Sequence, residues 1–273
     1  MLVQESMITR LRALCQRDER VVAALLYGSF TTGEGDANSD IEAAVFVADD
    51  ALPTFDQGAW VAQIAPVALY FADDFGHHTA LFTNLVRGEF HVEPASAMAI
   101  VASWRGNAWF PDLATVVLVD RTGQLAHHLQ PLAGAPIERD TPAGAQRLAD
   151  NFINGIVFGT AVLARGEVAR GLEVLSSVHR NLLWMARLLE RATTHWPTPA
   201  RAVERDLSAS AYARYVACTA PAQAGALWAA YRASWIWGKE MMEALARRHR
   251  LPVPTVLLAQ IDRQILEQPA PCE

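Results

Sequence analysis

The spacing of apolar residues changes near residue 140, and this change constrains the fold more than any other feature of the sequence. Before it, short apolar runs such as 21–27 (VVAALLY) and 41–47 (IEAAVFV) alternate with turn-rich segments, the pattern of buried strands. After Thr141-Pro142, a dipeptide typical of a helix start, apolar residues repeat at helical spacing. The first half is therefore predicted to be an α/β or α+β domain and the second half an all-helical bundle.

The expected elements follow from these two periodicities. Six strands are predicted, at residues 21–27, 41–47, 67–71, 79–83, 89–92 and 115–119. Helices are predicted at residues 6–15, 58–64 and 95–103 and, in the second half, from residue 142 onward and at 168–189, 200–215, 222–248 and 256–266. Prolines and a glycine in 131–136 indicate a boundary, so we expect domains at 1–130 and 142–273 joined by a linker at 131–141.

Composition and charge exclude several classes of protein. Hydrophobic residues make up 52% of the 273 residues and charged ones 19%, which excludes an intrinsically disordered chain. The net charge is −6, but residues 1–140 carry 18 acidic and 8 basic side chains, whereas residues 141–273 carry 11 acidic and 15 basic ones. Because the acidic first half lacks the basic surface that polynucleotides need, we expect no nucleic-acid partner.

The sequence also predicts a cytoplasmic protein without a membrane partner. No predominantly apolar run reaches the roughly 18 residues of a spanning helix, and charged residues interrupt the first 20 residues, unlike a signal peptide. The cysteines, Cys15, Cys218 and Cys272, are far apart and have no zinc-binding spacing, which fits a reducing compartment. The oligomeric state is left open by the sequence, a homodimer included.

Residues 25–47 carry the chemistry. A buried strand ends at Gly28-Ser29, a turn-rich loop follows, and the next strand begins with Asp40-Ile41-Glu42. Side chains alternate along a strand, so Asp40 and Glu42 face the same side and repel each other. A divalent cation such as Mg²⁺, which takes carboxylate oxygens and substrate phosphates as ligands, would offset this repulsion. Gly28 lets the backbone approach an anion closely, and Ser29 offers an amide and a hydroxyl to phosphate.

These motifs resemble a known family. The segments YGSFTTGEGDANSDIE (27–42) and RGEFHVEP (87–94), with a helical second half, are similar to the two-domain lincosamide nucleotidyltransferases, which belong to the polymerase-beta type of nucleotidyltransferase. The resemblance implies an α+β fold in which a mixed-sheet nucleotidyltransferase domain precedes a helical substrate-binding domain. It also implies Mg²⁺-dependent transfer of AMP from ATP, or NMP from another nucleoside triphosphate, to a hydroxyl of a lincosamide such as lincomycin or clindamycin, with release of pyrophosphate and inactivation of the drug.

The family pattern requires a third carboxylate on a strand beside Asp40 and Glu42. In residues 87–93, Glu89, His91 and Glu93 share one face of a predicted strand. Glu93 precedes a proline at the end of that strand, so Glu89 is the expected residue. Glu89 would either accept the proton of the drug hydroxyl or complete the metal site. Glu93 is the alternative candidate for the third carboxylate. His91 is a candidate contact for the substrate.

Other ionisable clusters give weaker signals. Adjacent residues of an extended segment face opposite ways, so the pair His77-His78 does not by itself make a metal site. The resemblance implies that a basic side chain of the helical half contacts the triphosphate, and the candidates are Arg165, Arg170, Arg180 and Arg187. The expected partners are thus a small antibiotic and a nucleoside triphosphate. The alternative is a minimal nucleotidyltransferase that modifies another small molecule such as an aminoglycoside, or a protein or tRNA in a toxin-antitoxin pair.

Overall fold

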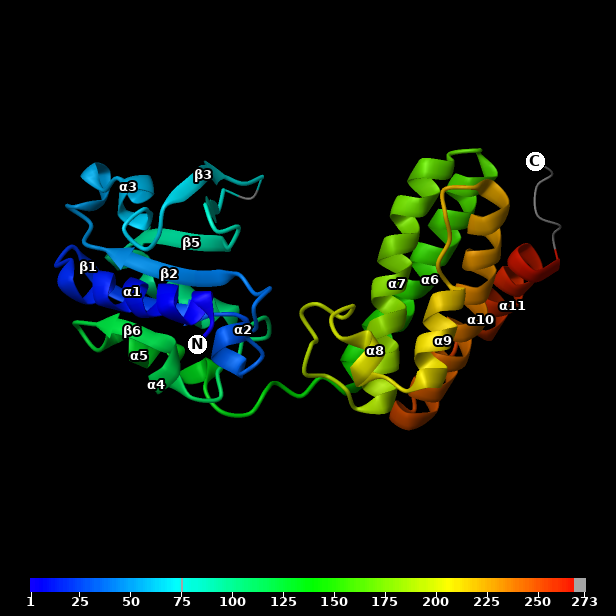
Figure 1. Cartoon of the computed structure of the whole chain (residues 1–273). Helices are drawn as coiled ribbons and strands as arrows, with labels where there is room; N and C mark the ends of the chain where they lie inside the picture. Colours follow the sequence, from blue (N-terminus) through cyan, green and yellow to red (C-terminus); the bar gives the residue numbers. More distant parts are fainter. Residues whose placement is uncertain (75, 268–273) are drawn as a thin grey trace. The chain divides into compact units, whose positions relative to one another are not determined.

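The chain divides into two compact units, Met1–Ile137 and Glu138–Glu273. The computed structural model describes residues 1–74 and 76–267 (Figure 1). The first unit is built on a sheet and the second on helices, so the predicted α+β class, a mixed sheet followed by a helical bundle, is confirmed. In the part of the chain that the structure describes, no helix is both long and apolar enough to cross a membrane.

The first unit contains a six-stranded mixed sheet in the order β3-β4-β5-β2-β1-β6. Strands β2 and β5 run parallel, and the other neighbouring pairs are antiparallel. The strands are β1 (Val21–Tyr27), β2 (Ile41–Val47), β3 (Val67–Ala72), β4 (His78–Phe82), β5 (Arg87–Pro94) and β6 (Val117–Asp120). The short elements around them are α2 (Ser29–Thr32), the 3₁₀ helices Leu52–Thr54, Ala95–Trp104 and Gln130–Leu132, α3 (Gln57–Val61), α4 (Leu113–Val116) and α5 (Gln124–Leu129).

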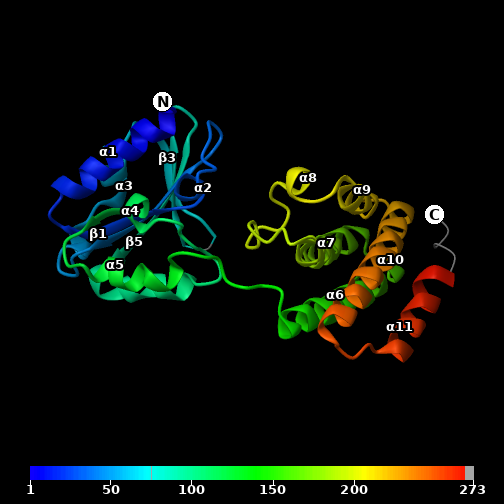
Figure 2. The same cartoon turned by 90° about the horizontal axis from the view of Figure 1, so that it is seen from below.

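Helices cover both faces of this sheet. The amphipathic helix α1 (Val3–Arg17) and α3 pack on one face, where Leu11, Trp60 and Phe90 belong to one apolar core. On the other face α4, α5 and the 3₁₀ helix Ala95–Trp104 enclose a second core with Phe46 and Leu129. In Figure 2, α1 and α5 lie on opposite sides of the strands. Because β1 and β2 are apolar on both faces, they read as continuous hydrophobic runs in the sequence.

Two predicted elements differ from the structure. The strand expected at 115–119 begins only at Val117, because Asp112 accepts a hydrogen bond from the amide of Ala114 and starts the short helix α4. The helix expected at 200–215 is divided into α8 (Val203–Asp206) and α9 (Ala209–Ala217). The break lies at Ser208, whose hydroxyl accepts a hydrogen bond from the amide of Ala211 and so begins a new helix.

The second unit is organised by three long helices that pack against one another. They are α6 (Pro142–Ala164), α7 (Val168–Glu190) and α10 (Ala224–His249), and the shorter α11 (Thr255–Asp262) and the π-helical turn Arg263–Glu267 follow. As expected, Thr141 caps α6, since its side chain accepts a hydrogen bond from the amide of Gly144. Cys218 lies in this core and Cys15 in the first unit, both as buried free thiols, and Cys272 lies outside the described residues.

Glycines allow α6 and α10 to approach closely. A Cβ on Gly159 would lie 2.1 Å from the hydroxyl oxygen of Tyr231, and one on Gly238 would lie 2.1 Å from the ring of Phe152. The hydroxyl of Tyr231 donates to the carbonyl of Gly171 on α7 at 2.8 Å, so its buried polar atom is satisfied. The three long helices are therefore held at short distance by aromatic rings placed against glycines.

Arg187 is a fully buried cation on α7. Its guanidinium donates hydrogen bonds to the carbonyl oxygens of Ala192, Pro199 and Arg201 and to the carboxylate of Asp206. These bonds tie the irregular segment between α7 and α9 to the bundle. Because its donors point to partners within the helical unit, Arg187 is not a phosphate contact, and this candidate from the sequence is wrong.

We expect Arg187→Met to lower the free energy of unfolding of the helical unit by about 3–5 kcal/mol, because it removes one donor to Asp206 and the donor to the three carbonyl groups that Arg187 binds. The measurement is denaturant unfolding followed by far-UV circular dichroism. Arg247→Gln is the control, since Arg247 is exposed on α10 and its loss should change stability by less than about 0.5 kcal/mol. Equal stability of the two variants would contradict a structural role for the buried guanidinium.

Candidate active site

Four neighbouring strands bring polar side chains into one row across the sheet. Tyr27 on β1 is paired with Glu42 on β2, Glu42 with Glu89 on β5, and Glu89 with Thr79 on β4. Residues paired across neighbouring strands point to the same face, so these four side chains lie side by side. The helices of that face cover Ala44 and Phe46, further along β2, and Glu42 lies at the opposite end of the strand. In this row Tyr27, Glu42 and Glu89 are partly exposed, whereas Thr79 is buried.

Gly28 and Ser29 form a tight turn against the carboxylate of Glu42. Gly28 has φ +76°, and a Cβ at this position would lie only 1.6 Å from Oε2 of Glu42. Both the backbone conformation and the space therefore require glycine. The hydroxyl of Ser29 is buried and has no hydrogen-bond partner among the described residues. Because an unpartnered buried hydroxyl is costly, Ser29 is poised to bond a group that the chain itself does not supply.

The loop that precedes Asp40 is held in place by hydrogen bonds. The carboxylate of Asp36 accepts bonds from the amide of Asn38 and the hydroxyl of Ser39, which closes a turn. From α1, the buried amide of Gln4 donates to the carbonyls of Ala37 and Ser39 at 2.9 and 3.1 Å. This pair of bonds fixes the backbone directly before Asp40. Gln4 precedes the helix predicted at residues 6–15, so the helical pattern carried no signal for this contact.

Arg87 joins two of the predicted site carboxylates. Its Nη1 lies 2.7 Å from Oδ2 of Asp40, and its Nη2 lies 2.8 Å from Oε2 of Glu89. The guanidinium thus offsets part of the repulsion among Asp40, Glu42 and Glu89. From the sequence a divalent cation was expected to offset this repulsion, and Arg87 was not among the predicted site residues. Nothing within residues 87–93 shows that this arginine reaches back to Asp40, because the contact depends on the pairing of β2 with β5.

Glu89 has the most elaborate environment of the predicted residues. Burial would raise the pKa of its carboxyl, but hydrogen bonds from Arg87, His91 and Tyr27 outweigh this effect and lower it. Its Oε1 accepts from the Tyr27 hydroxyl at 3.0 Å and lies 3.1 Å from Nε2 of His91. Burial, together with the nearby negative charge of Glu89, raises the pKa of Tyr27, so its hydroxyl keeps the donating proton. Glu89 is therefore an oriented carboxylate at neutral pH.

The other two residues of the β5 face lie at increasing distance from Glu42 along the sheet. His91 is paired with Ala44, and its ring makes an edge contact with Tyr27 at a centroid distance of 5.7 Å. Glu93 is paired with Phe46, four residues along the strand from the partner of Glu89. The structure thus brings Glu89 to Glu42 and leaves Glu93 at the other end of β5.

The carboxylates at this end of the sheet are the kind of ligand that a hard divalent cation takes, although the ligand atoms of Asp40, Glu42 and Glu89 do not all lie within 4.8 Å of one another. Asp40, Glu42 and Glu89 offer only carboxylate oxygens, the ligands that Mg²⁺ prefers. Beside them, the buried hydroxyl of Ser29 has no hydrogen-bond partner among the described residues and can donate to an oxygen of an anionic group. A divalent ion with phosphate oxygens among its ligands satisfies both halves of this arrangement.

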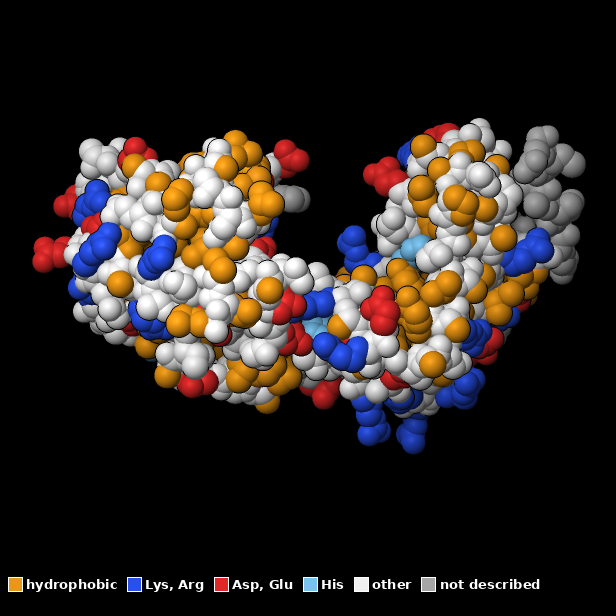
Figure 3. All heavy atoms as spheres, viewed as in Figure 1, with side chains coloured by type: hydrophobic (Ala, Val, Ile, Leu, Met, Phe, Trp, Pro, Cys, Tyr) orange, Lys and Arg blue, Asp and Glu red, His pale blue; other side chains and the backbone are white. Residues whose placement is uncertain are grey.

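Apolar side chains extend the same row beyond β4. Phe71 on β3 is paired with Thr79, and Leu69 is paired with Leu81. Both Phe71 and Leu69 are exposed, and Figure 3 shows hydrophobic side chains at the surface around β3. Because Tyr70 packs with the core of the opposite face, Phe71 and Leu69 point to the face that carries Glu89. The carboxylates are therefore continued by an apolar surface suited to a partly apolar small molecule.

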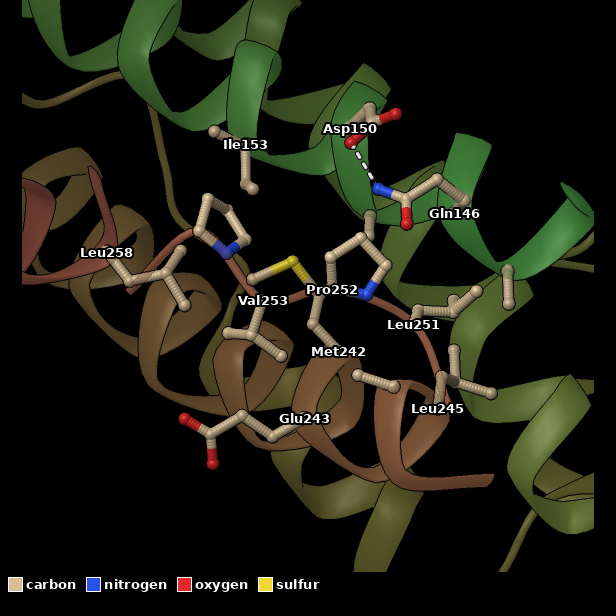
Figure 4. A pocket seen from close by; sticks show the side chains of 14 residues that line it. Gln146, Asp150, Ile153, Met242, Glu243, Leu245, Leu251, Pro252, Val253 and Leu258 are labelled. Atoms are coloured by element: carbon tan, nitrogen blue, oxygen red, sulfur yellow. Dashed lines mark hydrogen bonds between the residues drawn. The ribbon is translucent and has the colours of Figure 1, made fainter. Parts of the chain in front are cut away.

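The helical unit contains a separate apolar pocket. It lies between α6, α10 and the segment before α11, and its lining includes Ile153, Met242 and Leu258 (Figure 4). Two carboxylates, those of Asp150 and Glu243, belong to the same lining, and Gln146 donates to Asp150 at 2.8 Å. Its cavity volume is about 30 Å³, room for only one or two water molecules, so the pocket as it stands is too small for a drug-sized ligand.

The remaining arginine candidates of the helical unit are surface residues. Arg170 pairs with Glu167 at 2.9 Å, and Arg165 lies 3.9 Å from the same glutamate. Arg180 lies on α7 and is exposed. Unlike Arg187, these side chains are accessible, but their contacts within the unit do not distinguish one of them as a ligand for phosphate.

Comparison with known proteins bears on the helical unit. Residues 141–264 match the family model of the lincosamide nucleotidyltransferase-like C-terminal domain. Among solved structures, an aminoglycoside 6-adenyltransferase from Bacillus subtilis is similar at 14% identity and a TM-score of 0.45, with 96% of each chain covered. A nucleotidyltransferase-like protein from Exiguobacterium sibiricum 255-15 is similar at 11% identity and a TM-score of 0.37, covering 97% of this chain and 79% of the other.

No curated protein matches the sequence. The family match rests on the helical half, whereas the motifs that led to the same family lie in residues 27–42 and 87–94 of the sheet unit. The predicted resemblance is therefore confirmed through the helical half: residues 141–264 match the C-terminal domain of the lincosamide nucleotidyltransferase-like family.

Proposed function

We propose that the protein transfers a nucleoside monophosphate, AMP from ATP in the first instance, to a hydroxyl of a lincosamide antibiotic. The observation that carries the proposal is the row of Glu42 and Glu89 beside the turn at Gly28 and Ser29. It combines oxygen ligands for Mg²⁺ with an unsatisfied donor for phosphate. The match of residues 141–264 supports a lincosamide as acceptor, because the family is named for enzymes of that activity.

In this proposal the chain binds the nucleotide through the Gly28-Ser29 turn and the carboxylates of β2. The hydroxyl of Ser29 donates to a phosphate oxygen, and glycine at position 28 lets the carboxylate of Glu42 pack against the backbone of the turn. Asp40 and Glu42 hold Mg²⁺, which when bound supplies positive charge to the phosphate oxygens. Gln4 keeps Asp40 in position through the loop that precedes it.

Glu89 acts as the base for the attacking hydroxyl. It accepts the proton as the acceptor oxygen forms a bond to the α-phosphorus and the bond to the pyrophosphate oxygen breaks. Its lowered pKa makes it a weaker base but keeps it ionised at neutral pH, so that it is ready to accept the proton. Arg87 and Tyr27 hold its two oxygens in a fixed orientation. The exposed apolar residues Leu69 and Phe71 offer a wall for the apolar part of the acceptor.

The direct test is mass spectrometry of a panel of antibiotics incubated with the protein, ATP and Mg²⁺. We expect lincomycin or clindamycin to gain the mass of one AMP and pyrophosphate to be released. Modification of an aminoglycoside alone would keep the transfer chemistry but contradict the lincosamide assignment. No modified product with any acceptor or nucleoside triphosphate would contradict the proposal itself.

A matched pair of variants tests the role of Glu89 in the same assay. Glu89→Gln should lower the single-turnover rate by about 10²- to 10⁴-fold, the usual size of a general-base contribution, while ATP and drug still bind. Glu93→Gln is the control, because Glu93 lies beside Phe46 and should transfer at nearly the wild-type rate. If calorimetry shows that Glu89→Gln loses Mg²⁺ or ATP affinity as well, Glu89 is a metal ligand rather than the base. An inactive Glu93→Gln beside an active Glu89→Gln would exchange the two assignments.

Ser29→Ala should weaken ATP binding by about tenfold to a hundredfold, since a hydrogen bond to a charged group is worth about 1.5–3 kcal/mol. The fold should not lose stability, because the deleted hydroxyl is buried and has no partner among the described residues. Calorimetric titration with ATP and Mg²⁺ measures the first effect, and thermal unfolding measures the second. Ser103→Ala, which removes an exposed hydroxyl, is the control. An unchanged ATP affinity would remove Ser29 from the nucleotide site.

The pH dependence of transfer should report the contact of Arg87 with Glu89. Burial raises the pKa of Glu89, and the bonds from Arg87 are among those that lower it, so Arg87→Gln should raise this pKa. Because the base works only when ionised, the acid limb of kcat/KM against pH should move to higher pH in Arg87→Gln. Arg17→Gln, on the helix that covers the opposite face, should leave the midpoint unchanged. A midpoint in Arg87→Gln equal to the wild type would contradict this electrostatic role.

A further inference from the structure

Two imidazoles lie next to Glu89, and only one of them comes from the same strand. The antiparallel pairing of β4 with β5 places Thr79 opposite Glu89. His77, two residues before Thr79, therefore falls beside His91, two residues after Glu89. The two rings are 4.2 Å apart between centroids. His78 does face the other way, as expected for neighbours in an extended segment, and stacks on Tyr70.

The three side chains present their ligand atoms to a common point. Oε1 of Glu89 lies 3.1 Å from Nε2 of His91 and 4.0 Å from Nδ1 of His77. One ligand atom from each residue lies within 4.8 Å of the others. A zinc ion bound at about 2.0–2.1 Å in tetrahedral geometry separates its ligand atoms by roughly 3.4 Å, a value between the two measured distances. Small side-chain rotations would thus bring the three atoms to coordination distance.

The surroundings orient these ligands and leave them accessible. Tyr27 donates to the ligating oxygen of Glu89, and Arg87 holds the other oxygen, so the carboxylate is supported in the manner of a metal ligand. The positive charge of Arg87 opposes a cation, but Asp40 pairs with it, and a carboxylate oxygen of Asp73 lies 3.9 Å from the His77 ring. His77 is partly exposed to solvent, so an ion can reach the site.

The chemistry of the donors decides which ion the site takes. Two imidazole nitrogens and one carboxylate oxygen suit Zn²⁺ and similar d-block ions, whereas Mg²⁺ prefers a set made of oxygens alone. The all-oxygen set of Asp40 and Glu42 and the mixed set around His77 therefore differ in the ion they prefer, although Glu89 belongs to both.

We propose that His77, Glu89 and His91 form a binding site for a divalent d-block ion such as Zn²⁺, and that an ion bound there inhibits nucleotidyl transfer. The inhibitory half rests on the proposed function, because the ion takes the lone pair of Glu89 that would accept the proton of the acceptor hydroxyl. The binding half does not depend on any activity. It requires only that the three side chains ligate together.

The test is titration of the whole chain with Co²⁺, followed by its visible absorption, and with Zn²⁺, followed by calorimetry, in the absence of nucleotide and acceptor. The variants are His77→Gln and the matched control His78→Gln. We expect the wild type and His78→Gln to bind one ion with a low-coordinate Co²⁺ spectrum, and His77→Gln to lose at least tenfold in affinity and to lose that spectrum. Equal affinity and spectra in wild type and His77→Gln would overturn the site.

Transfer assays at fixed Mg²⁺ with increasing Zn²⁺ test the inhibitory half. Zn²⁺ should inhibit the wild type and His78→Gln, and His77→Gln should resist it while keeping its rate without Zn²⁺. Zn²⁺ that binds with the expected dependence on His77 but leaves transfer unchanged would overturn the inhibition. Should the protein transfer no nucleotide to any acceptor, the Co²⁺ titration still decides the site, so failure of the proposed function and failure of the metal site give different results.

Discussion

Three carboxylates crowd one end of the sheet, and their mutual repulsion must be offset by positive charge. Asp40 and Glu42 lie at the start of β2, and the parallel pairing with β5 adds Glu89 in register with Glu42. Within the chain, Arg87 supplies the offset by bridging Asp40 and Glu89. Like charges at such a site disfavour one another's ionised forms, so this guanidinium keeps Glu89 ionised at neutral pH.

Residues of the neighbouring helix and strand hold this charged cluster in place. From α1, Gln4 crosses to the loop before Asp40, and from β1, Tyr27 reaches Glu89. Gly28 closes the cluster by packing its backbone on Glu42, an approach that no side chain at this position would permit. These contacts come from a helix, a strand and a tight turn, and they fix the directions in which the site carboxylates point. The Ser29 hydroxyl has no partner among the described residues and can therefore bond a ligand.

The helical unit is stabilised by different means. Its long helices pack glycines against Tyr231 and Phe152, and its buried polar centre is the guanidinium of Arg187 with the carbonyls that it binds. A buried cation of this kind organises an irregular segment that apolar packing alone would leave with unpaired carbonyl groups. Arg187, one of four arginines that were candidates for a phosphate contact, is thus a structural residue because it is fully buried, which the helical period did not reveal.

The sequence by itself determined the fold class and which residues of the candidate site share one face of a strand. Strand alternation predicts that Asp40 shares a face with Glu42 and that Glu89 shares one with Glu93, because side-chain direction depends only on position along one strand. Only the tertiary structure decided that Glu89 rather than Glu93 lies beside Glu42, that Arg87 reaches Asp40, and that His77 meets His91. These contacts depend on which strands pair and in which register, and pairing is set by packing across the whole sheet rather than by neighbouring residues.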